Sequence, residues 1–153
     1  MKNILVSACL LGIPCRYDGK SKPCEAVTAL SEKYNLIPVC PEVDGGLPTP
    51  RTPSERIGDR VMMRDGRDVT DNYKRGAIHA LMLCKEHNIT TAILKERSPS
   101  CGRGKIYDGT FCGKLTDRDG VTAELLLKSG IRVLGETEAE EIRKIYDGRE
   151  NNE

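Results

Sequence analysis

Three cysteines, Cys9, Cys40 and Cys101, lie at or just beyond the ends of short apolar runs of the chain. The runs are, in order, NILVSA, LIPVC and TTAILKE. Short continuous apolar runs are typical of strands buried in a parallel sheet. Because the carboxyl ends of parallel strands share the edge where open α/β folds bind ligands, we expect the three thiols to meet there. Thiolates brought together in this way suit a metal ion or an iron–sulfur cluster.

The cellular compartment decides how the seven cysteines of the chain are interpreted. The apolar stretch near the N-terminus is interrupted by Gly12, Pro14 and Arg16 and lacks a cleavage region, unlike a signal peptide. No segment reaches the roughly 18 apolar residues of a membrane span. We therefore expect a cytoplasmic protein, in which metal, cluster or thiol chemistry explains the cysteines better than a disulfide framework does.

The other four cysteines have different sequence contexts. Cys84 falls on the apolar stripe of an expected helix, so we interpret it as an inert core residue. Cys24 and Cys112 lie in a first helical turn and in a loop, and we assign them no role. Cys15 follows a Gly-Ile-Pro turn close to Cys9, which leaves two alternatives, a fourth ligand or a neighbouring accessory thiol.

The type of cofactor is only partly constrained by these thiols. Zinc fingers usually carry paired CxxC motifs, which this chain lacks, and a structural zinc ion takes four ligands. Soft thiolates also select iron–sulfur clusters. A [4Fe–4S] cluster held by three cysteines leaves one iron open for a substrate. Scattered thiols that bind nothing remain the alternative at this point.

Strands and helices are expected to alternate along the chain. We predict strands over residues 3–8, 36–40, 90–96 and 131–135, and helices over residues 24–35, 71–88, 121–130 and 138–146. This alternation predicts an α/β fold, a single domain over residues 1–148 with a mostly parallel sheet flanked by helices. Residues 149–153 are expected to form a frayed tail.

The connecting segments carry turn and capping signals. Residues 44–60 are rich in glycine and proline and predict a long loop, and residues 97–120 predict a loop with a small hairpin. Asp65-Gly66, flanked by strand-like residues, predicts a hairpin over 61–69.

Two helices begin at recognisable capping residues. Thr70 is expected to cap the helix over 71–88. Thr137 and Glu140 have the spacing of a capping box for the last helix.

The overall charge gives no sign of a nucleic-acid or membrane partner. The chain has 24 basic and 23 acidic residues, a net charge of +1, with one Phe and no Trp. The composition therefore does not predict a broad positive field or an aromatic platform on which the bases of single-stranded nucleic acid stack. Arg97, Arg103 and Lys105 form a local basic patch that weakens the case against RNA, but we do not expect intact nucleic acid to bind.

Three longer blocks of sequence surround the cysteines at the strand ends: SACLLGIPCRYDG, VCPEVDGGLPTPR and ERSPSCGRGKIYDG. In type and order they resemble the signature blocks of the thiouracil desulfurase family, formerly a domain of unknown function. The similarity runs from about residue 3 to about residue 134. The resemblance implies a Rossmann-like α/β domain, a [4Fe–4S] cluster on three cysteines, and non-redox removal of sulfur from thiouracil-type bases.

The resemblance also implies roles for individual residues. It places the cluster ligands on Cys9, Cys40 and Cys101, the same three thiols that the strand ends select. Cys15 stands where relatives do not always have cysteine, which favours an accessory thiol. The implied substrate is a small thiolated pyrimidine, either a free base, a nucleoside or a fragment of RNA.

Two further positions match those that the family uses for catalysis, Glu42 in VCPE and Ser98 in ERSPSCG. Glu42 lies two residues beyond a cluster ligand, within reach for general acid–base work on a water molecule. Ser98 is expected to orient the substrate or relay a proton. Asp18, in CRYDG, and Arg51, in the long loop, are candidate substrate-binding residues, for lining the site and for meeting the polar edge of the substrate; a plain Asp-Gly turn and a structural arginine are the alternatives.

Two other functions remain compatible with the sequence. An iron–sulfur protein that senses oxygen or passes electrons needs no small-molecule substrate, and it usually saturates its irons with cysteine. A sulfur carrier or zinc protein would hold no iron. Purification in air is expected to remove the cluster in either of the iron-containing cases. The oligomeric state is not predicted.

Overall fold

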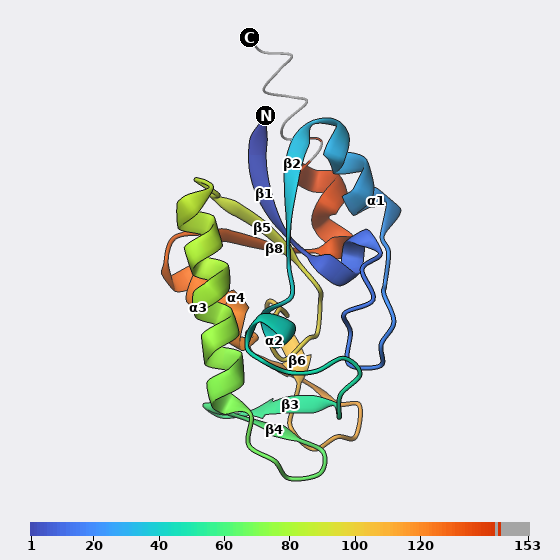
Figure 1. Cartoon of the computed structure of the whole chain (residues 1–153), viewed down its shortest axis with the longest axis vertical. Coiled ribbons are helices and arrows are strands. Elements are labelled where there is room, and N and C mark those ends of the chain that lie inside the picture. Colours follow the sequence, from blue (N-terminus) through green and yellow to red (C-terminus); the bar gives the residue numbers. More distant parts are fainter. Residues whose placement is uncertain (143, 145–153) are drawn as a thin grey trace.

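A four-stranded parallel sheet forms the centre of the protein (Figure 1). The structure is a computed structural model, and it describes residues 1–142 and 144. From one edge to the other the strands are β2 (Tyr34–Val39), β1 (Lys2–Ser7), β5 (Thr91–Leu94) and β8 (Arg132–Gly135). The chain moves from β1 to β2 on one side and then to β5 and β8 on the other. The order of the strands therefore reverses beside β1, where open parallel sheets bind their ligands.

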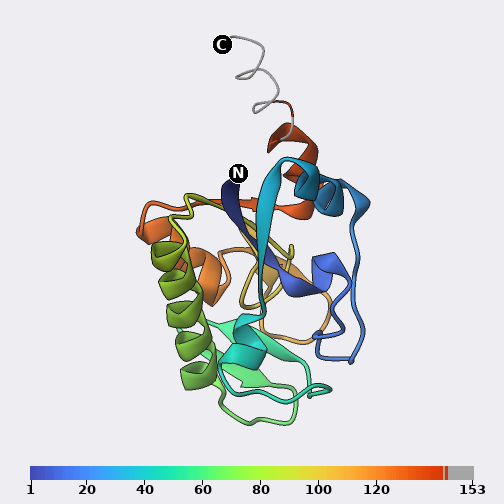
Figure 2. The ribbon, with the colours of Figure 1, turned by 45° about the horizontal axis from the view of Figure 1, so that its top comes forward.

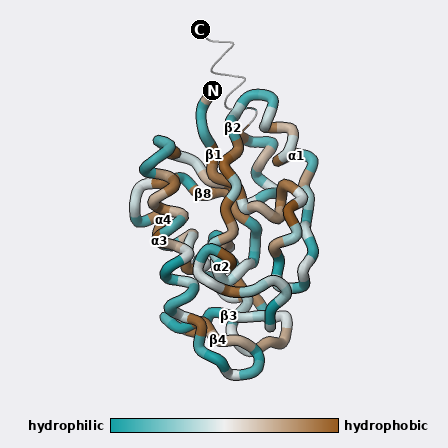
Figure 3. Tube along the Cα trace, in the orientation of Figure 1, coloured by the Kyte–Doolittle hydropathy of each residue, from teal (hydrophilic) through white to brown (hydrophobic). Residues whose placement is uncertain are grey.

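The central strands are buried on both faces, which explains their continuous apolar sequences. Ile4 and Val6 of β1 pack into a core on one side of the sheet, and Leu5 packs into the core on the other. Ile93 and Ala92 of β5 divide in the same way between the two cores. This alternation follows the two-residue period of a strand. The hydrophobic residues accordingly gather along the middle of the molecule (Figure 3).

Helices cover both faces of the sheet (Figure 2). On one face lie α3 (Thr70–Glu86) and α4 (Val121–Lys128). On the other lie η1 (Ala8–Leu11), α1 (Glu25–Thr28), η2 (Ala29–Glu32) and the segment after η3 (Glu136–Glu138). The predicted α/β fold, with a parallel sheet flanked by helices, is confirmed. Among the described helices, none combines the length and the apolar character needed to cross a membrane.

A short helix, α2 (Pro41–Asp44), follows β2 and packs tightly against α3. A Cβ atom on Gly76 would lie 1.8 Å from the carbonyl oxygen of Pro41, and one on Gly45 would lie 2.0 Å from the carbonyl oxygen of Asn72. Both distances are far below any tolerable contact, so the two helices can approach only because these residues have no side chain. The glycines thereby fix the position of α2 on α3.

The long helix α3 matches the prediction closely. Tyr73, Ala77, Ala80 and Cys84 form its buried stripe. Cys84 is 1% exposed, and burial raises its pKa to about 11. A neutral, buried thiol of this kind is a packing residue, in agreement with its predicted role.

Two hairpins lie beyond the carboxyl ends of the sheet strands (Figure 1). One pairs β6 (Lys105–Tyr107) with β7 (Leu115–Asp117), as predicted for the loop over 97–120. The other pairs β3 (Ser54–Ile57) with β4 (Arg60–Met63). The second hairpin corrects the prediction of an unbroken loop over 44–60, because β3 lies within that segment.

The hairpin predicted over 61–69 is also present in a short form. Asp65-Gly66 forms its turn, with the N–H of Gly66 donating to the Met63 carbonyl at 2.9 Å. Beyond the turn, the N–H of Met63 donates to the Arg67 carbonyl at 2.8 Å, Met62 and Asp68 form a bridge, and the N–H of Val69 donates to the Val61 carbonyl at 2.9 Å. The longer ladder forms around Gly58, whose φ of 59° suits glycine.

Two predicted caps are replaced by neighbouring ones. Val69 is the N-cap of α3, and Asp68 supplies the hydrogen-bond acceptor, taking the N–H and the hydroxyl of Thr70 at 2.9 and 2.6 Å. At the last helix, the Glu138 carboxylate accepts the N–H of Gly135 at 3.1 Å. Thr137 donates instead to Glu96, so the predicted box with Glu140 is wrong.

The first helix is shorter than predicted. Residues 24–35 divide into α1, η2 and the start of β2, because Tyr34 and Asn35 pair with β1 in the sheet. The predicted tail over residues 149–153 lies outside the described residues.

Candidate active site

A cavity of about 550 Å³ opens at the carboxyl ends of β1, β2 and β5. Four cysteines line it: Cys9, Cys15, Cys40 and Cys101. The strand-end thiols thus meet at one edge of the sheet, as expected from the topology. Cys24, Cys84 and Cys112 are not among the lining residues.

Each strand-end thiol is held by a turn that starts where its strand stops. Cys9 lies in the 3₁₀ turn η1, directly after β1, and is 7% exposed. Cys40 is the N-cap of α2, directly after β2. Cys101 follows β5 at the end of a turn closed by the N–H of Gly102 and the carbonyl of Ser98 at 2.9 Å. The backbone therefore fixes all three sulfurs before any ligand binds.

Cys15 lies among these thiols as a fourth member. Its side chain contacts the sulfurs of Cys40 and Cys9, and its carbonyl accepts the Cys40 thiol at 3.7 Å. The structure therefore places Cys15 inside the thiol group, although the sequence left its position open.

The surroundings of Cys40 and Cys101 raise the pKa of both thiols. Burial raises the pKa of Cys101 to about 12. The hydrogen bond to Cys15, followed by burial, raises the pKa of Cys40 well above its ordinary value. Ionising such buried sulfurs requires a compensating positive centre, which bound iron supplies.

The spacing of the donors bears on the kind of centre that fits. In the part of the chain that the structure describes, no group of three or more His, Cys, Asp or Glu side chains could hold a single metal ion. A cubane cluster presents separate irons at its corners, so its thiolate ligands stand farther apart than those of one ion. Thiols from three different strand ends, around one cavity, suit a cluster by their donor type.

Glu42 lies in α2 and points to the same cavity. Its carboxylate accepts a hydrogen bond from Nε of Arg51 at 3.1 Å. Nη2 of Arg51 also donates to the Cys15 carbonyl at 2.9 Å, and Nη1 donates to the carbonyl of Pro48 and the hydroxyl of Thr49, both at 3.1 Å. One guanidinium therefore connects the carboxylate to the loop that carries Cys15.

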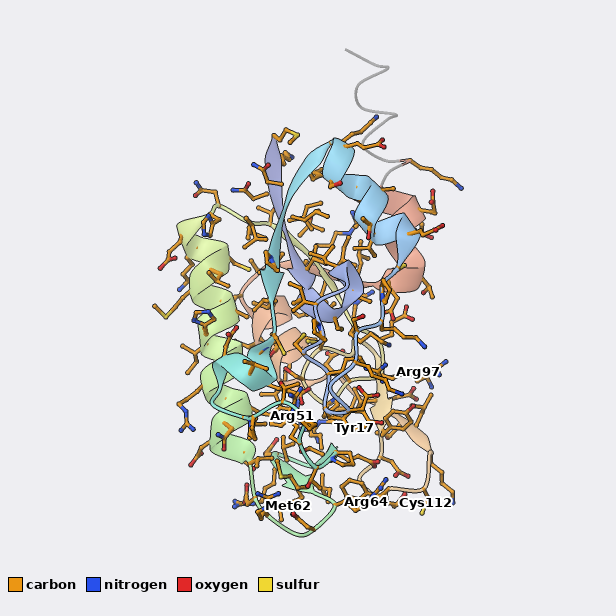
Figure 4. The ribbon with its side chains drawn as sticks, turned by 45° about the vertical axis from the view of Figure 1, so that its right-hand side comes forward. Tyr17, Arg51, Met62, Arg64, Arg97 and Cys112 are labelled. Carbon is orange, nitrogen blue, oxygen red and sulfur yellow. The ribbon has the colours of Figure 1, made fainter. Side chains whose placement is uncertain are left out.

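The surroundings of Arg51 bear on its predicted role in substrate binding. Its side chain is 3% exposed, and its backbone N–H donates to the Tyr17 carbonyl at 2.7 Å. Figure 4 shows Arg51 beside Tyr17. The guanidinium donors described above all bond to protein acceptors, so the geometry favours a positioning role for Arg51.

Ser98 lies in the turn that leads to Cys101. Its hydroxyl oxygen accepts the N–H groups of Ser100 and Cys101, each at 3.1 Å. Its own hydrogen takes no part in these two bonds, so Ser98 can form the turn and also donate to a bound molecule. Ser100 is fully buried and shares a 2.8 Å hydrogen bond with Thr122, a structural contact.

Asp18, the other predicted substrate contact, does not line the cavity. Its carboxylate accepts the N–H of Lys20 at 3.0 Å and lies 4.0 Å from Arg16. In the structure Asp18 stabilises its own turn, and its role in binding stays a prediction.

Several lining residues were not predicted from the sequence. The Glu55 carboxylate accepts the N–H groups of Gly109 and Phe111 at 2.9 and 3.1 Å, which holds the β6–β7 connection against β3. Arg64 lies over the Phe111 ring, 5.6 Å from its centre. Tyr73 reaches the cavity from α3. The lone phenol within a stripe of alanine and cysteine was the only available signal for Tyr73, since a buried tyrosine normally needs a polar partner.

Comparison with known proteins agrees with this geometry. The 2-thiouracil desulfurase family matches residues 4–138. The chain belongs to the 2-thiouracil desulfurase family. Among members and relatives, the uncharacterised protein YbbK of Bacillus subtilis strain 168 is 44% identical over 149 residues, covering 91% of this chain and 99% of that protein.

A solved structure also supports membership of the 2-thiouracil desulfurase family. It is described as the [4Fe-4S]-dependent thiouracil desulfidase TudS. It superposes with a TM-score of 0.90 at 46% sequence identity, covering 96% of this chain and 99% of the other. The predicted family is therefore confirmed.

Proposed function

We propose that this protein is an iron–sulfur-dependent desulfurase that converts the C=S group of a thiouracil-type base or nucleoside into C=O. The observation that carries the proposal is the meeting of the strand-end cysteines with Glu42 and Ser98 around one cavity. Family membership and the [4Fe-4S]-dependent solved relative support the same reaction.

Cys9, Cys40 and Cys101 would hold the cluster, with Cys15 as an accessory thiol. When bound, a [4Fe–4S] cluster with three thiolate ligands supplies an open iron, a Lewis acid with affinity for sulfur. The raised pKa values of Cys40 and Cys101 fit this assignment, since an anionic thiolate in such a buried place needs a cationic partner.

Glu42 would act as the general base. Net hydrolysis adds water to the thiocarbonyl carbon, forms C=O and releases sulfide, with no change of oxidation state. A carboxylate that removes protons from the water speeds such a step by about 100-fold or more. The hydrogen bond from Arg51 fixes the carboxylate, which leaves its second oxygen for the water.

Ser98 would orient the pyrimidine. Its hydroxyl hydrogen is available beside Cys101, where it can donate to a ring nitrogen or to the oxygen of the base. A cavity of about 550 Å³ is in the usual size range of sites for small organic ligands, so it suits a base or a nucleoside.

The proposal is tested by anaerobic reconstitution with iron and sulfide, followed by incubation with thiouracil and thiouridine. We expect stoichiometric sulfide and the corresponding oxo-pyrimidine, measured by a sulfide assay and chromatography. If protein with a full cluster releases no sulfide from any thiolated pyrimidine, the proposal is wrong.

A second function is favoured by one observation, the place of Cys15 among the other thiols. A fourth cysteine ligand would close the cluster and favour an electron-transfer or sensor protein. Cys15→Ser separates the two functions. Loss of the cluster favours the redox protein, and retention with desulfurase activity favours the enzyme.

A further inference from the structure

Tyr73 is buried in α3, yet its hydroxyl lacks a hydrogen-bond partner. The side chain is 1% exposed, and its hydroxyl is the one buried side-chain polar atom without a partner in the part of the chain that the structure describes. Burying an unpaired hydroxyl costs free energy, and phenylalanine would fill the same space without that cost. The phenol therefore calls for an explanation beyond packing.

The groups around the Tyr73 hydroxyl provide such an explanation. Tyr73 lines the cavity, together with Glu42 and Ser54. The Glu42 carboxylate and the Ser54 hydroxyl lie close enough to act on the phenol, although neither is in hydrogen-bonding geometry with it. Three polar groups thus face one another from α3, α2 and β3 across a small space.

The position of this group is fixed by backbone packing. Gly76 lies one helical turn beyond Tyr73, and Gly45 lies just beyond Glu42 at the end of α2. The two close contacts through these glycines hold α2 against α3, so Tyr73 and Glu42 keep their relative position. Groups held this rigidly can bind a small molecule without reorganisation.

We propose that Tyr73, Glu42 and Ser54 bind the water molecule that attacks the substrate, and that Tyr73 is a further catalytic residue. The inference rests on the proposed desulfurase function. The Tyr73 hydroxyl donates to the water oxygen, and the water donates its two hydrogens to Glu42 and Ser54. The remaining lone pair is free to attack the thiocarbonyl carbon. Water in a polar niche typically has two to four such partners.

The step balances without an oxidant or reductant. The C–O bond forms as one water proton passes to Glu42. As the C–S bond breaks, the hydroxyl group on carbon loses the second proton and becomes C=O, and the leaving sulfur takes up the two protons as hydrogen sulfide. Tyr73 remains protonated throughout, since burial, followed by the charge of Glu42, holds its pKa well above the ordinary value. It acts as a hydrogen-bond donor that positions the nucleophile.

The test compares Tyr73→Phe with Tyr34→Phe, a second buried tyrosine, which lies in β2 and does not line the cavity. For Tyr73→Phe we expect kcat to fall by about 100- to 1,000-fold, the range in which losing one positioned donor falls, with KM little changed. Tyr34→Phe is expected to keep its kcat.

Two readouts separate catalysis from structure. The cluster-free Tyr73→Phe protein should unfold at the same temperature as wild type or higher, because no protein hydrogen bond is lost. The reconstituted variant should show the cluster absorbance of wild type. A lower unfolding temperature, a lost cluster or an unchanged kcat would each overturn the inference.

Sulfide release by the wild-type protein tests the proposed function separately from the role of Tyr73. Absence of sulfide release by the reconstituted wild-type protein overturns both proposals. Activity in wild type that is undiminished in Tyr73→Phe overturns this inference alone. Ser54→Ala provides a second variant at the same niche, and a fall in kcat with an intact cluster is expected there too.

Discussion

Arg51 joins Glu42 to the backbone of Cys15: its Nε donates to the carboxylate at 3.1 Å and its Nη2 donates to the Cys15 carbonyl at 2.9 Å. A single buried guanidinium therefore sets the distance between the proposed base and the thiol loop. Planar, multidentate bonding of this kind is a property of arginine that lysine does not reproduce.

Replacing Arg51 by lysine should therefore damage both stability and activity. Lysine keeps the positive charge but cannot reach these acceptors together. We expect the free energy of unfolding to fall by about 1–3 kcal/mol, the cost of leaving a buried polar group without its hydrogen bond, and kcat to fall by about tenfold or more. Chemical denaturation of the cluster-free protein and sulfide-release kinetics measure the two effects.

The control for Arg51→Lys is Arg67→Lys. Arg67 pairs with Asp65 at 2.8 Å, but its side chain is 64% exposed. Its replacement should change stability little and leave kcat intact, because exposed ion pairs contribute little to stability. Equal effects of the two substitutions would contradict the role assigned to Arg51.

The cysteines should divide into two classes on substitution by serine. Each of Cys9→Ser, Cys40→Ser and Cys101→Ser should lower the iron content and the visible absorbance of the reconstituted protein, because serine is a poorer ligand for soft iron sites. Cys112 is exposed and outside the cavity, so Cys112→Ser should reconstitute like wild type. Full iron loading of any of the first three variants would remove that residue from the ligand set.

Glu55 should control how well the substrate binds. Its carboxylate accepts two N–H groups of the β6–β7 connection, and such charge-assisted bonds are roughly twice as strong as neutral ones. In Glu55→Gln the Phe111 wall of the cavity should loosen, raising KM by about three- to tenfold at similar kcat.

Steady-state kinetics with thiouracil check the effect of Glu55. Glu124→Gln is a suitable comparison, since Glu124 also accepts a charged bond, from Arg56 at 3.0 Å, but does not line the cavity. A fall in kcat at constant KM in Glu55→Gln would show that Glu55 acts on the chemistry and not on the wall.

Asp68 should make stability depend on pH in the acid range. The hydrogen bonds from Thr70 and the ion pair with Arg60 lower the pKa of Asp68 from its ordinary 3.8 to about 2. A carboxyl group with a lowered folded-state pKa stabilises the protein above its ordinary pKa, and this contribution is lost as the pH falls from about 4 to about 2. Urea midpoints across this range measure the loss.

Asp68→Asn should reduce that acid-range slope, because asparagine does not titrate. Glu86→Gln, at the other end of α3, changes an exposed carboxyl group on the same helix. It should leave the slope close to that of wild type. If Asp68→Asn and wild type lose stability in parallel below pH 4, the assignment to Asp68 is wrong.

The sequence predicted the parts of the site that follow from strand order, and it missed the parts that depend on contacts between segments distant in sequence. The meeting of Cys9, Cys40 and Cys101 followed from strand order alone, since parallel strands bring their carboxyl ends together whatever the loops do. The β3–β4 hairpin escaped prediction because β3 lies in a segment rich in glycine and proline, which locally predicts a loop. The contribution of Tyr73 depends on the contact of α2 with α3, which no local pattern encodes.

The helix N-caps show the same limit of prediction from local sequence. Thr70 and Thr137 have capping side chains, but an acceptor one or two positions away forms the observed bond. Sequence patterns thus located the helix starts to within a turn and missed the residue that stabilises them.

The cavity has two kinds of wall, and the contact between Gly76 and Pro41 makes one of them rigid. The wall built from α2 and α3 cannot yield, because even a methyl group at Gly76 would meet the Pro41 carbonyl at 1.8 Å. The opposite wall, around Phe111, is a surface connection held by hydrogen bonds from its backbone to one carboxylate. An engineer who wants this scaffold to accept a bulkier heterocycle should therefore vary the connection and leave the glycine-packed helices alone. Reactivity and substrate size are, in this architecture, separately adjustable properties.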